Sequence, residues 1–342
     1  MLILTSDQMV RQSKPTVVQK KNDPYIYLRV MDEWYCYNPT QPPLGSGAMG
    51  DVYLGYRCKN GAEVAVKRVK DAYANNQMIR ERARLEASLA FRHPNLVEMI
   101  GCCEYAPTYG PIFLLSNFVH GEDIDKYVKG FSDSPNRVEK ICGAVCSVLD
   151  ALDYVHSRGV IHRDIKPSNI MIENGSNVRL MDLGISRING GNKFSQYGFI
   201  GTPQYSAPEQ IKRDEGNSEV SINATTDIYE LGITFYELLT GENPMACQSD
   251  SETLTKQITE PLPENDAIPK KIMQVIWKAT QKEQSKRFQT ALEFKNAINE
   301  ALKPDPPLSE KINEWVRSHI ITVVSLIAAL FVIIFILLLI FK

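Results

Sequence analysis

The stretch "VIHRDIKPSNIMI", residues 160–172, places charged and amide side chains between two short apolar runs. Asp164, Lys166 and Asn169 stand close together in it. Short apolar runs are typical of buried strands, where an unpaired charge costs free energy. These polar residues therefore form either an ordinary polar turn between strands or a site that holds charge.

A second candidate site is the glycine-rich stretch "LGSGAMGDV", which contains Gly45, Gly47 and Gly50. Dinucleotide-binding proteins carry such glycines between a strand and a helix. Here a strand-like sequence follows the glycines, so we expect a hairpin. Because glycine has no side chain, the backbone N–H groups of such a hairpin can approach phosphate oxygens closely.

Two further charged residues follow apolar runs. Lys67 ends the run "VAVK", and Asp182 opens "DLG" after an apolar pair. In a fold with two lobes, we expect Lys67 to point into the cleft, where it can meet phosphate groups. Asp164, Asn169 and Asp182 together offer the oxygen ligands that magnesium prefers and usually shares with substrate phosphates.

The elements that must position these residues differ between the two halves of the chain. Residues 44–70 predict two strands joined by a hairpin, and residues 72–92 predict a helix rich in Ala, Arg and Glu. After Gly121, apolar residues at helical spacing predict a helix over 137–157. Further helices are expected at about 224–239, 269–280 and 290–302. The sequence thus predicts an α+β fold with two lobes and a cleft between them.

Five short motifs occur in one order along the chain. They are GxGxxGxV, VAVK, HRDxKPxN, DLG and APE, the last at Ala207–Glu209. Through them the chain, over roughly residues 30–300, resembles a eukaryotic-type (Hanks-type) protein kinase. The resemblance implies a two-lobed protein kinase fold, with a small β-rich N-lobe and a larger helical C-lobe. Lys166 and the sequence "GTPQY" are similar to serine/threonine kinases rather than tyrosine kinases.

The resemblance also implies roles for individual residues, with ATP and Mg²⁺ as cofactors. Asp164 accepts the proton of the substrate hydroxyl, and Lys166 steadies the transferring phosphoryl group. Asp182 and Asn169 hold magnesium ions, and Lys67 contacts the phosphates. The implied ATP-binding residues are Leu44, Gly45, Ser46, Gly47, Gly50, Val52, Ala65, Lys67, Ser116, Asn117 and Val119.

One departure from the family pattern concerns the glutamate that pairs with the ATP-positioning lysine. Counting back from His93 at the usual spacing reaches Arg84 instead of a glutamate. We expect Glu86 to take this role, with two residues fewer after it in the chain. Glu81 is an alternative, and a solvated helix face is a possible location for either glutamate.

Other positions carry structural expectations from the same resemblance. Asp227 is expected to brace the catalytic loop, Arg287 to pair with Glu209, and His162 to have a structural role. Ser116 occupies the position that gates the space behind ATP, where the residue is usually larger. Leu in place of Phe in "DLG" keeps the apolar character and is not a sign of inactivity.

Composition limits the partners and the compartment. The formal net charge is −2 and the pI about 6.3, so no basic excess is available for nucleic acid. Seven cysteines without a repeated CxxC pattern indicate reduced thiols rather than a disulfide framework.

The C-terminal region differs in character from the rest of the chain. Residues 320–341 contain no charged side chain. A helix of this length spans roughly 33 Å, enough for a hydrocarbon core. A buried core helix is the alternative. We expect a single-pass transmembrane helix with the kinase domain in the cytoplasm, because Lys311 and Arg317 flank its N-terminal side.

The expected organisation follows from these observations. It comprises a flexible arm at 1–29, a kinase domain at 30–302 with lobes at about 30–116 and 121–302, a juxtamembrane linker at 303–319, and the transmembrane helix at 320–341. An outer sensor is not expected, because only Lys342 follows the span.

The expected function is ATP-dependent phosphorylation of Ser/Thr hydroxyls on proteins, regulated by autophosphorylation, which a homodimer could perform. The candidate acceptors are Ser186, Ser195, Tyr197 and Thr202. Ser195 is the first choice, since in the family the position of Thr202 contacts the catalytic loop. The alternative is a weak pseudokinase that acts as a membrane-tethered, nucleotide-binding scaffold.

Overall fold

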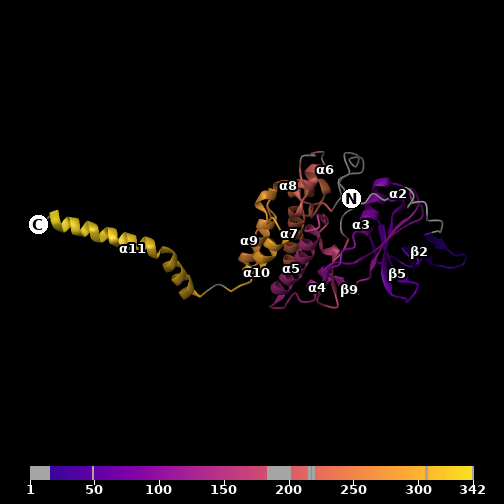
Figure 1. Cartoon of the computed structure of the whole chain (residues 1–342), viewed down its shortest axis with the longest axis horizontal. Coiled ribbons are helices and arrows are strands. Elements are labelled where there is room, and N and C mark those ends of the chain that lie inside the picture. Colours follow the sequence, from indigo (N-terminus) through magenta and orange to yellow (C-terminus); the bar gives the residue numbers. More distant parts are fainter. Residues whose placement is uncertain are drawn as a thin grey trace. The chain divides into compact units, whose positions relative to one another are not determined.

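The computed structural model describes residues 16–47, 50–182, 202–214, 217, 220–304 and 307–340. It divides into two compact units, Met1–Ala301 and Leu302–Lys342. Within the first unit, strands gather on one side and helices α5, α7, α9 and α10 on the other (Figure 1). This arrangement agrees with the expected two-lobed fold.

One antiparallel sheet forms the N-terminal lobe, with the strand order β1-β2-β3-β5-β6-β8-β7 and the short β4 paired to β5. The strands are β1 (Val17–Gln19), β2 (Ile26–Val30), β3 (Glu33–Tyr37), β4 (Gly45–Ser46), β5 (Gly50–Arg57), β6 (Glu63–Val69), β7 (Met99–Glu104) and β8 (Ile112–Asn117). The hairpin expected over 44–70 is present as β5 and β6, which pair from Gly50↔Val69 to Tyr56↔Glu63.

The expectation of a flexible arm over residues 1–29 is wrong for residues 16–29, because β1 and β2 belong to the sheet. Leu28 is fully buried and packs with Phe113 and Leu115 of β8 in one apolar cluster. The backbone N–H of Arg29 donates to the carbonyl of Thr16 at 2.7 Å. Burying apolar side chains in this cluster offsets the entropy of ordering the segment.

Two helices replace the single helix expected over 72–92. They are α2 (Asp71–Ala74) and α3 (Gln77–Ser88), and the side chain of Asn76 caps α3 by accepting from the N–H groups of Met78 and Ile79. Asn76 therefore interrupts the helix, since such a side chain favours an N-cap over a helix interior.

A fully buried guanidinium, that of Arg80, attaches α3 to the β7–β8 connection. It donates to the carbonyls of Pro107 at 3.1 Å and Gly110 at 3.0 Å, and it pairs with Glu104 at 3.1 Å. Arg84 pairs with the same carboxylate at 2.9 Å. These contacts fix the orientation of α3 relative to the sheet.

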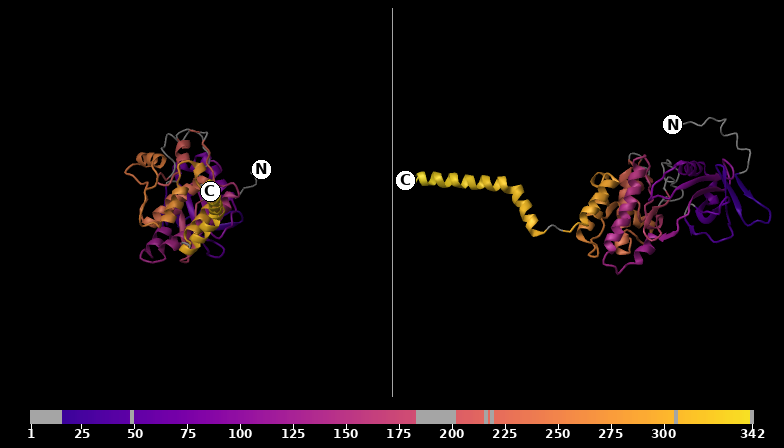
Figure 2. Two further views of the ribbon diagram at one scale, coloured as in Figure 1. Left: turned by 90° about the vertical axis from the view of Figure 1, so that its left-hand side faces the viewer. Right: turned by 60° about the horizontal axis from the view of Figure 1, so that its bottom comes forward.

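The second lobe is mainly helical, and Figure 2 shows it from two further sides. Its elements are β9 (Gly121–Asp123), α4 (Ile124–Lys129), α5 (Arg137–His156), η1 (Pro167–Asn169), β10 (Ile170–Glu173), β11 (Asn177–Leu180), α6 (Pro208–Asp214), α7 (Ala224–Thr240), α8 (Asp250–Thr259), α9 (Lys270–Ala279), η4 (Gln284–Lys286) and α10 (Ala291–Ala301). Helix α7 is buried on nearly every side. At Gly232 a Cβ atom would lie 2.6 Å from Thr280, so glycine permits the close approach of α7 to the end of α9.

The second unit contains α11 (Leu308–Ile340). The expected linker over 303–319 is therefore helical from Leu308 onward. Among the helices of the described residues, none combines the length and apolar character needed to span a membrane. The expected transmembrane span over 320–341 lies partly outside the described residues. Residues 341 and 342 and several side chains of α11 are not described.

Candidate active site

Four side chains meet at the start of β10 and form one polar cluster. The amide of Asn169 donates to both the backbone carbonyl and the carboxylate of Asp164, at 2.8 and 3.0 Å. Lys166 Nζ lies 3.1 Å from the Asp164 carboxylate. Lys166 also donates to the hydroxyl of Thr202 at 2.9 Å, and that hydroxyl donates to Asp164 at 3.2 Å. The hydroxyl of Thr202 is thus held by the two residues expected to handle a substrate hydroxyl.

The buried carboxylate of Asp227 on α7 positions this cluster. It accepts the backbone N–H groups of His162 and Arg163 at 2.8 and 2.7 Å, and His156 Nε2 lies 2.6 Å from it. Burial opposes ionisation of Asp227, but the hydrogen bond and charge of His156 outweigh it and hold the pKa of Asp227 below its usual value. The bracing role expected for Asp227 is confirmed.

His162 itself faces the core. Its Nε2–H donates to the carbonyl of Met181 at 2.9 Å, and complete burial lowers the pKa of His162. A neutral, fully buried imidazole bonded to a backbone carbonyl has the structural role that the sequence predicted.

Lys67 and Asp182 form an ion pair of 2.7 Å across the two lobes. Lys67 lies in β6 between Val52 of β5 and Leu114 of β8. Burial alone would lower the pKa of Lys67, but the carboxylates of Asp182 and Glu86 raise it above its usual value. The structure therefore brings a cation and two carboxylates together beside the glycine-rich hairpin.

Glu86 is the glutamate of α3 that lies near Lys67, and only 6% of it is exposed. Burial raises the pKa of Glu86 to about 8, with Lys67 opposing the shift and Asp182 adding to it. Glu81 lies on the exposed side of the helix, where its carboxylate accepts from Gln77 at 2.9 Å. Arg84, at the usual family spacing, pairs with Glu104 instead.

The glycine-rich hairpin lies over this region with regular backbone pairing. The N–H of Gly47 donates to the carbonyl of Gly50 at 2.9 Å, and the N–H of Leu44 donates to that of Val52 at 2.7 Å. At Gly50 a Cβ atom would lie 2.5 Å from the carbonyl oxygen of Arg68, so only glycine fits. Residues 48 and 49 lie outside the described part of the chain.

The remaining residues of the expected ATP site lie in strands β6 and β8 or directly after β8. Ala65 of β6 lies directly opposite Ser116 of β8. Asn117 ends β8, and Val119 follows as a buried residue, 8% exposed. These positions therefore lie on two paired neighbouring strands or directly after them.

The oxygen atoms near this region fit a magnesium ion chemically. Asp182 supplies a carboxylate, and Asn169 supplies an amide oxygen, since its nitrogen already donates to Asp164. Within the described residues, no group of three or more His, Cys, Asp or Glu side chains forms a metal site of its own.

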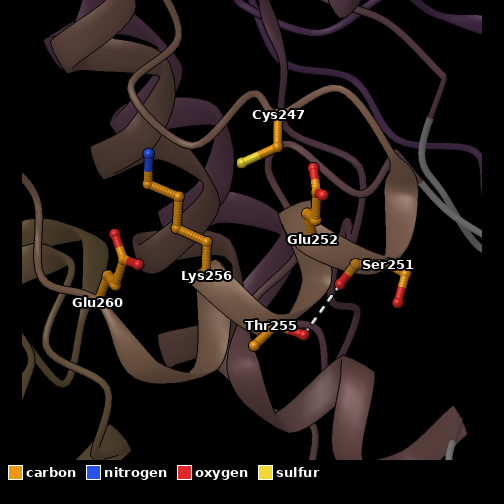
Figure 3. Close-up of a pocket in the computed structure, with 6 residues that line it drawn as sticks. All are labelled: Cys247, Ser251, Glu252, Thr255, Lys256 and Glu260. Atoms are coloured by element: carbon orange, nitrogen blue, oxygen red, sulfur yellow. Dashed lines mark hydrogen bonds between the residues drawn. The ribbon is translucent and has the colours of Figure 1, made fainter.

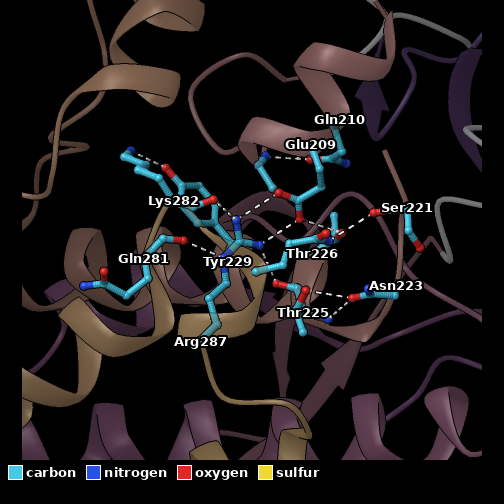
Figure 4. Close-up of polar contacts among 12 residues, drawn as sticks. Glu209, Gln210, Ser221, Asn223, Thr225, Thr226, Tyr229, Gln281, Lys282 and Arg287 are labelled. Carbon is cyan, nitrogen blue, oxygen red and sulfur yellow. Dashed lines mark hydrogen bonds and ion pairs between the residues drawn. The ribbon is translucent and has the colours of Figure 1, made fainter. Parts of the chain in front are cut away.

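The predicted pair of Arg287 and Glu209 is confirmed as a buried, bidentate contact (Figure 4). The two guanidinium nitrogens lie 2.7 and 2.9 Å from the two carboxylate oxygens. The ring of Tyr229 lies 4.7 Å from the guanidinium. The pair anchors the start of α6, which follows the segment that contains Thr202.

Sequence reasoning missed Glu230 and Gln210, which also hold the catalytic loop. The carboxylate of Glu230 accepts the N–H of Ile165 at 2.8 Å, and the amide of Gln210 donates to the carbonyl of Arg163 at 3.2 Å. A signal was present for Glu230, because this charged residue stands among the apolar residues Ile228, Leu231 and Ile233 of a helix that is buried on nearly every side.

An open pocket of about 410 Å³ lies against α8, away from this cluster (Figure 3). It is lined by Cys247, Ser251, Glu252, Thr255, Lys256 and Glu260. None of the expected site residues lines this pocket.

Comparisons with known proteins agree with the geometry. A family model described as a protein kinase domain matches residues 39–303. The serine/threonine-protein kinase PknB of Mycobacterium tuberculosis is 31% identical over 279 residues, covering 79% of this chain and 43% of the relative. PknH of Mycobacterium bovis is 33% identical over 271 residues, covering 77% and 43%. The chain thus spans less than half the length of these curated relatives.

Solved structures show the same fold. The crystal structure of the M. tuberculosis PknI kinase domain matches with a TM-score of 0.59 and 24% identity. The match covers 78% of this chain and 95% of that chain.

The raised pKa of Glu86 predicts a pH-dependent stability. Between the usual value of 4.5 and about 8, the folded protein binds more protons at Glu86 than the unfolded chain does. The free energy of unfolding attributable to this group therefore falls as the pH rises through that window. In Glu86→Gln this contribution is absent, so urea unfolding should show a flatter pH profile.

The matched control is Glu81→Gln, which changes an exposed glutamate of the same helix and should leave the profile as in the wild type. Identical pH slopes for the wild type and Glu86→Gln would contradict the raised pKa.

Proposed function

The chain belongs to the protein kinase family, and we propose that it transfers the γ-phosphoryl group of ATP to Ser/Thr hydroxyls of protein substrates. The observation that supports this proposal best is the contact of the Thr202 hydroxyl with Asp164 and Lys166. It shows that a hydroxyl fits between the carboxylate and the ammonium group. A substrate hydroxyl placed there would meet a proton acceptor and a cation together.

In the proposed reaction, the substrate oxygen forms a bond to the γ-phosphorus while the bond to the β–γ bridging oxygen breaks. The hydroxyl proton passes to Asp164, which Asn169 orients through two hydrogen bonds. Lys166 offsets the negative charge on the phosphoryl oxygens. Magnesium, when bound, would add charge neutralisation at the phosphates, and Asp182 and Asn169 are the residues that would hold it.

Lys67 is proposed to contact the α- and β-phosphates. Lys67 now pairs with Asp182, which is also a proposed magnesium ligand. When ATP and magnesium bind, the phosphates would become the partner of Lys67 and magnesium would become the partner of Asp182. Glu86 then remains near Lys67 as a buried carboxyl group of α3. The glycine-rich hairpin and the positions at Ala65, Ser116, Asn117 and Val119 would surround the nucleotide.

The alternative of a weak pseudokinase scaffold has less support. Nothing in the comparisons points to it, because the relatives reported above are named as serine/threonine kinases. Lys67, Asp164, Asn169 and Asp182 are also all of the residue types that the transfer reaction requires.

The first test of the proposal is Asp164→Asn. It should lower the rate of phosphate transfer to a generic acceptor protein such as casein by at least about 10²-fold, the scale of a general-base contribution. Nucleotide binding and the thermal midpoint should change little, since the variant keeps the size of the side chain. Near-normal turnover would exclude Asp164 as the proton acceptor.

A second part of the proposal is activation by autophosphorylation between two copies of the chain. Ser186, Ser195 and Tyr197 lie outside the described residues, whereas the hydroxyl of Thr202 is engaged by the catalytic residues. Ser195 therefore remains the first choice as acceptor, and Arg163 beside Asp164 offers a guanidinium for the new phosphate.

Mass spectrometry after incubation with ATP should find a phosphate on Ser195, and Ser195→Ala should be less active. Asp164→Asn provides the control, because it should carry no phosphate there. An unmodified loop in fully active protein would contradict this regulation.

For location, we propose that residues 320–341 anchor the protein in a membrane, with the kinase domain in the cytoplasm where ATP is present. The support comes from the composition of the segment, which carries no charge, and from the basic Lys311 and Arg317 before it. The position of the anchor after the kinase unit would let catalysis proceed without it.

Cell fractionation tests this proposal. The whole chain should sediment with membranes and need detergent for release, while a chain ending at Pro307 should stay in the supernatant and remain active. Whole-chain protein in the supernatant without detergent would contradict anchoring. A kinase domain protected from protease added on the cytoplasmic side would contradict the orientation.

A further inference from the structure

Gln257 on α8 is a fully buried polar residue that the catalytic cluster does not use. Its side-chain amide nitrogen donates to two successive backbone carbonyls, at 2.7 Å to Gln204 and 3.3 Å to Pro203. Both carbonyls belong to the segment that directly follows Thr202. One buried side chain of α8 therefore holds the backbone next to the catalytic residues.

This segment lies where a protein substrate must pass. The Thr202 hydroxyl contacts Asp164 and Lys166, and consecutive Cα atoms are about 3.8 Å apart. Pro203 and Gln204 therefore lie within about 8 Å of Thr202 along the chain. A polypeptide that presents a hydroxyl to Asp164 would lie against these residues, which we call the acceptor segment, residues 202–205.

Two residues from other helices hold Gln257 in turn. The hydroxyl of Tyr229, on α7, donates to the side-chain oxygen of Gln257 at 2.6 Å. Lys282, which lies beyond α9, donates from Nζ to the Tyr229 hydroxyl at 2.8 Å and to the backbone carbonyl of Gln257 at 2.7 Å. Each of these donors is directed at an acceptor, so the orientation of the Gln257 amide is fixed.

The cost of burying these groups indicates that the network is specific. Burial and the nearby Arg287 lower the pKa of Lys282 to about 8, with Glu260 opposing the shift. Figure 4 shows the side chains of Lys282 and Arg287 beside the ring of Tyr229, at 5.2 and 4.7 Å from its centroid. Buried polar groups are tolerated when they are hydrogen-bonded, and a fully connected network then specifies one arrangement of the segments it joins.

We propose that Gln257 is a positioning residue for protein substrates, which sets the shape of the acceptor segment through its two hydrogen bonds. The inference rests on the proposed kinase function and assigns α8 a part in recognising the substrate polypeptide. Among the described residues, the hydrogen bonds of Gln257 go to Pro203, Gln204, Tyr229 and Lys282, and none of these is assigned to the ATP site. The network of Lys282, Tyr229 and Gln257 attaches that segment to α7 and α8.

The experiment replaces Gln257 by Met, which keeps the length of the side chain and removes its donors. The KM for casein should rise about tenfold, the scale expected for two lost hydrogen bonds, while kcat and the KM for ATP stay within about twofold of the wild type. A merely structural role would instead lower the fraction of active protein and leave both KM values unchanged.

The matched control is Gln274→Met, the same change at an exposed glutamine of α9, which should leave every parameter as in the wild type. Tyr229→Phe is the second variant. It keeps the buried ring but removes the hydroxyl that orients Gln257, so it should raise the KM for casein in the same direction by a smaller factor. If Gln257→Met does not fold, the KM of Tyr229→Phe for casein tests the positioning role of Gln257.

Amide hydrogen exchange gives a readout that does not require catalysis. The N–H of Tyr205 is bonded to the carbonyl of Thr202 at 3.1 Å, and exchange of the acceptor segment should be faster in Gln257→Met than in the control. If the wild type is active but the variants keep the wild-type KM for casein and the wild-type rate of exchange, the inference about Gln257 is wrong and the proposed function stands. An inactive wild type would overturn the proposed function, and exchange would still decide whether Gln257 holds the segment.

Discussion

The buried carboxylate of Asp227 is the constraint on which the active site depends. It is fully buried, so it would cost several kcal/mol if it lacked partners. Two backbone N–H groups of the catalytic loop and the ring of His156 supply these partners. Because Asp227 belongs to helix α7, the loop is attached to a helix that is buried on nearly every side.

The same helix restrains the loop at further points. Glu230 accepts the N–H of Ile165, and the hydroxyl of Thr234 donates to the carbonyl of Ile165 at 3.3 Å. Polar residues at successive turns of a buried helix thus satisfy the backbone of a segment that has no regular secondary structure. This arrangement allows Arg163 to adopt a φ of 65°, a left-handed conformation that is unfavourable for most residues.

The N-terminal lobe contributes to the site in a different way. Its Lys67 forms an ion pair of 2.7 Å with Asp182 of the second lobe, and Glu86 lies buried nearby. Ionic partners can be exchanged when other charges arrive, whereas a buried backbone restraint cannot. Backbone hydrogen bonds within the C-terminal lobe therefore fix the catalytic loop, whereas the contact between the two lobes at Lys67 depends on an ion pair.

The sequence by itself determined the fold class and the residues of the catalytic cluster, because these depend on residue type and order. Asp164, Lys166 and Asn169 lie within one short loop, so their proximity follows from chain connectivity. The pair of Arg287 and Glu209 also followed from the motifs, since family resemblance relates distant positions. Glu86 was expected over Glu81 although the usual family spacing reaches Arg84, and the structure places Glu86 near Lys67.

Only the tertiary structure decided the contacts between segments that are distant in the chain and carry no motif. Residues 16–29 seemed a polar arm, yet Leu28 completes a core made with β8, because a short strand is stable only when it pairs with a sheet. Gln257 gave no signal in the sequence, since an isolated glutamine in a helix is usually exposed. Its role depends on which carbonyls lie within reach of its amide, and that is a property of the packed chain alone.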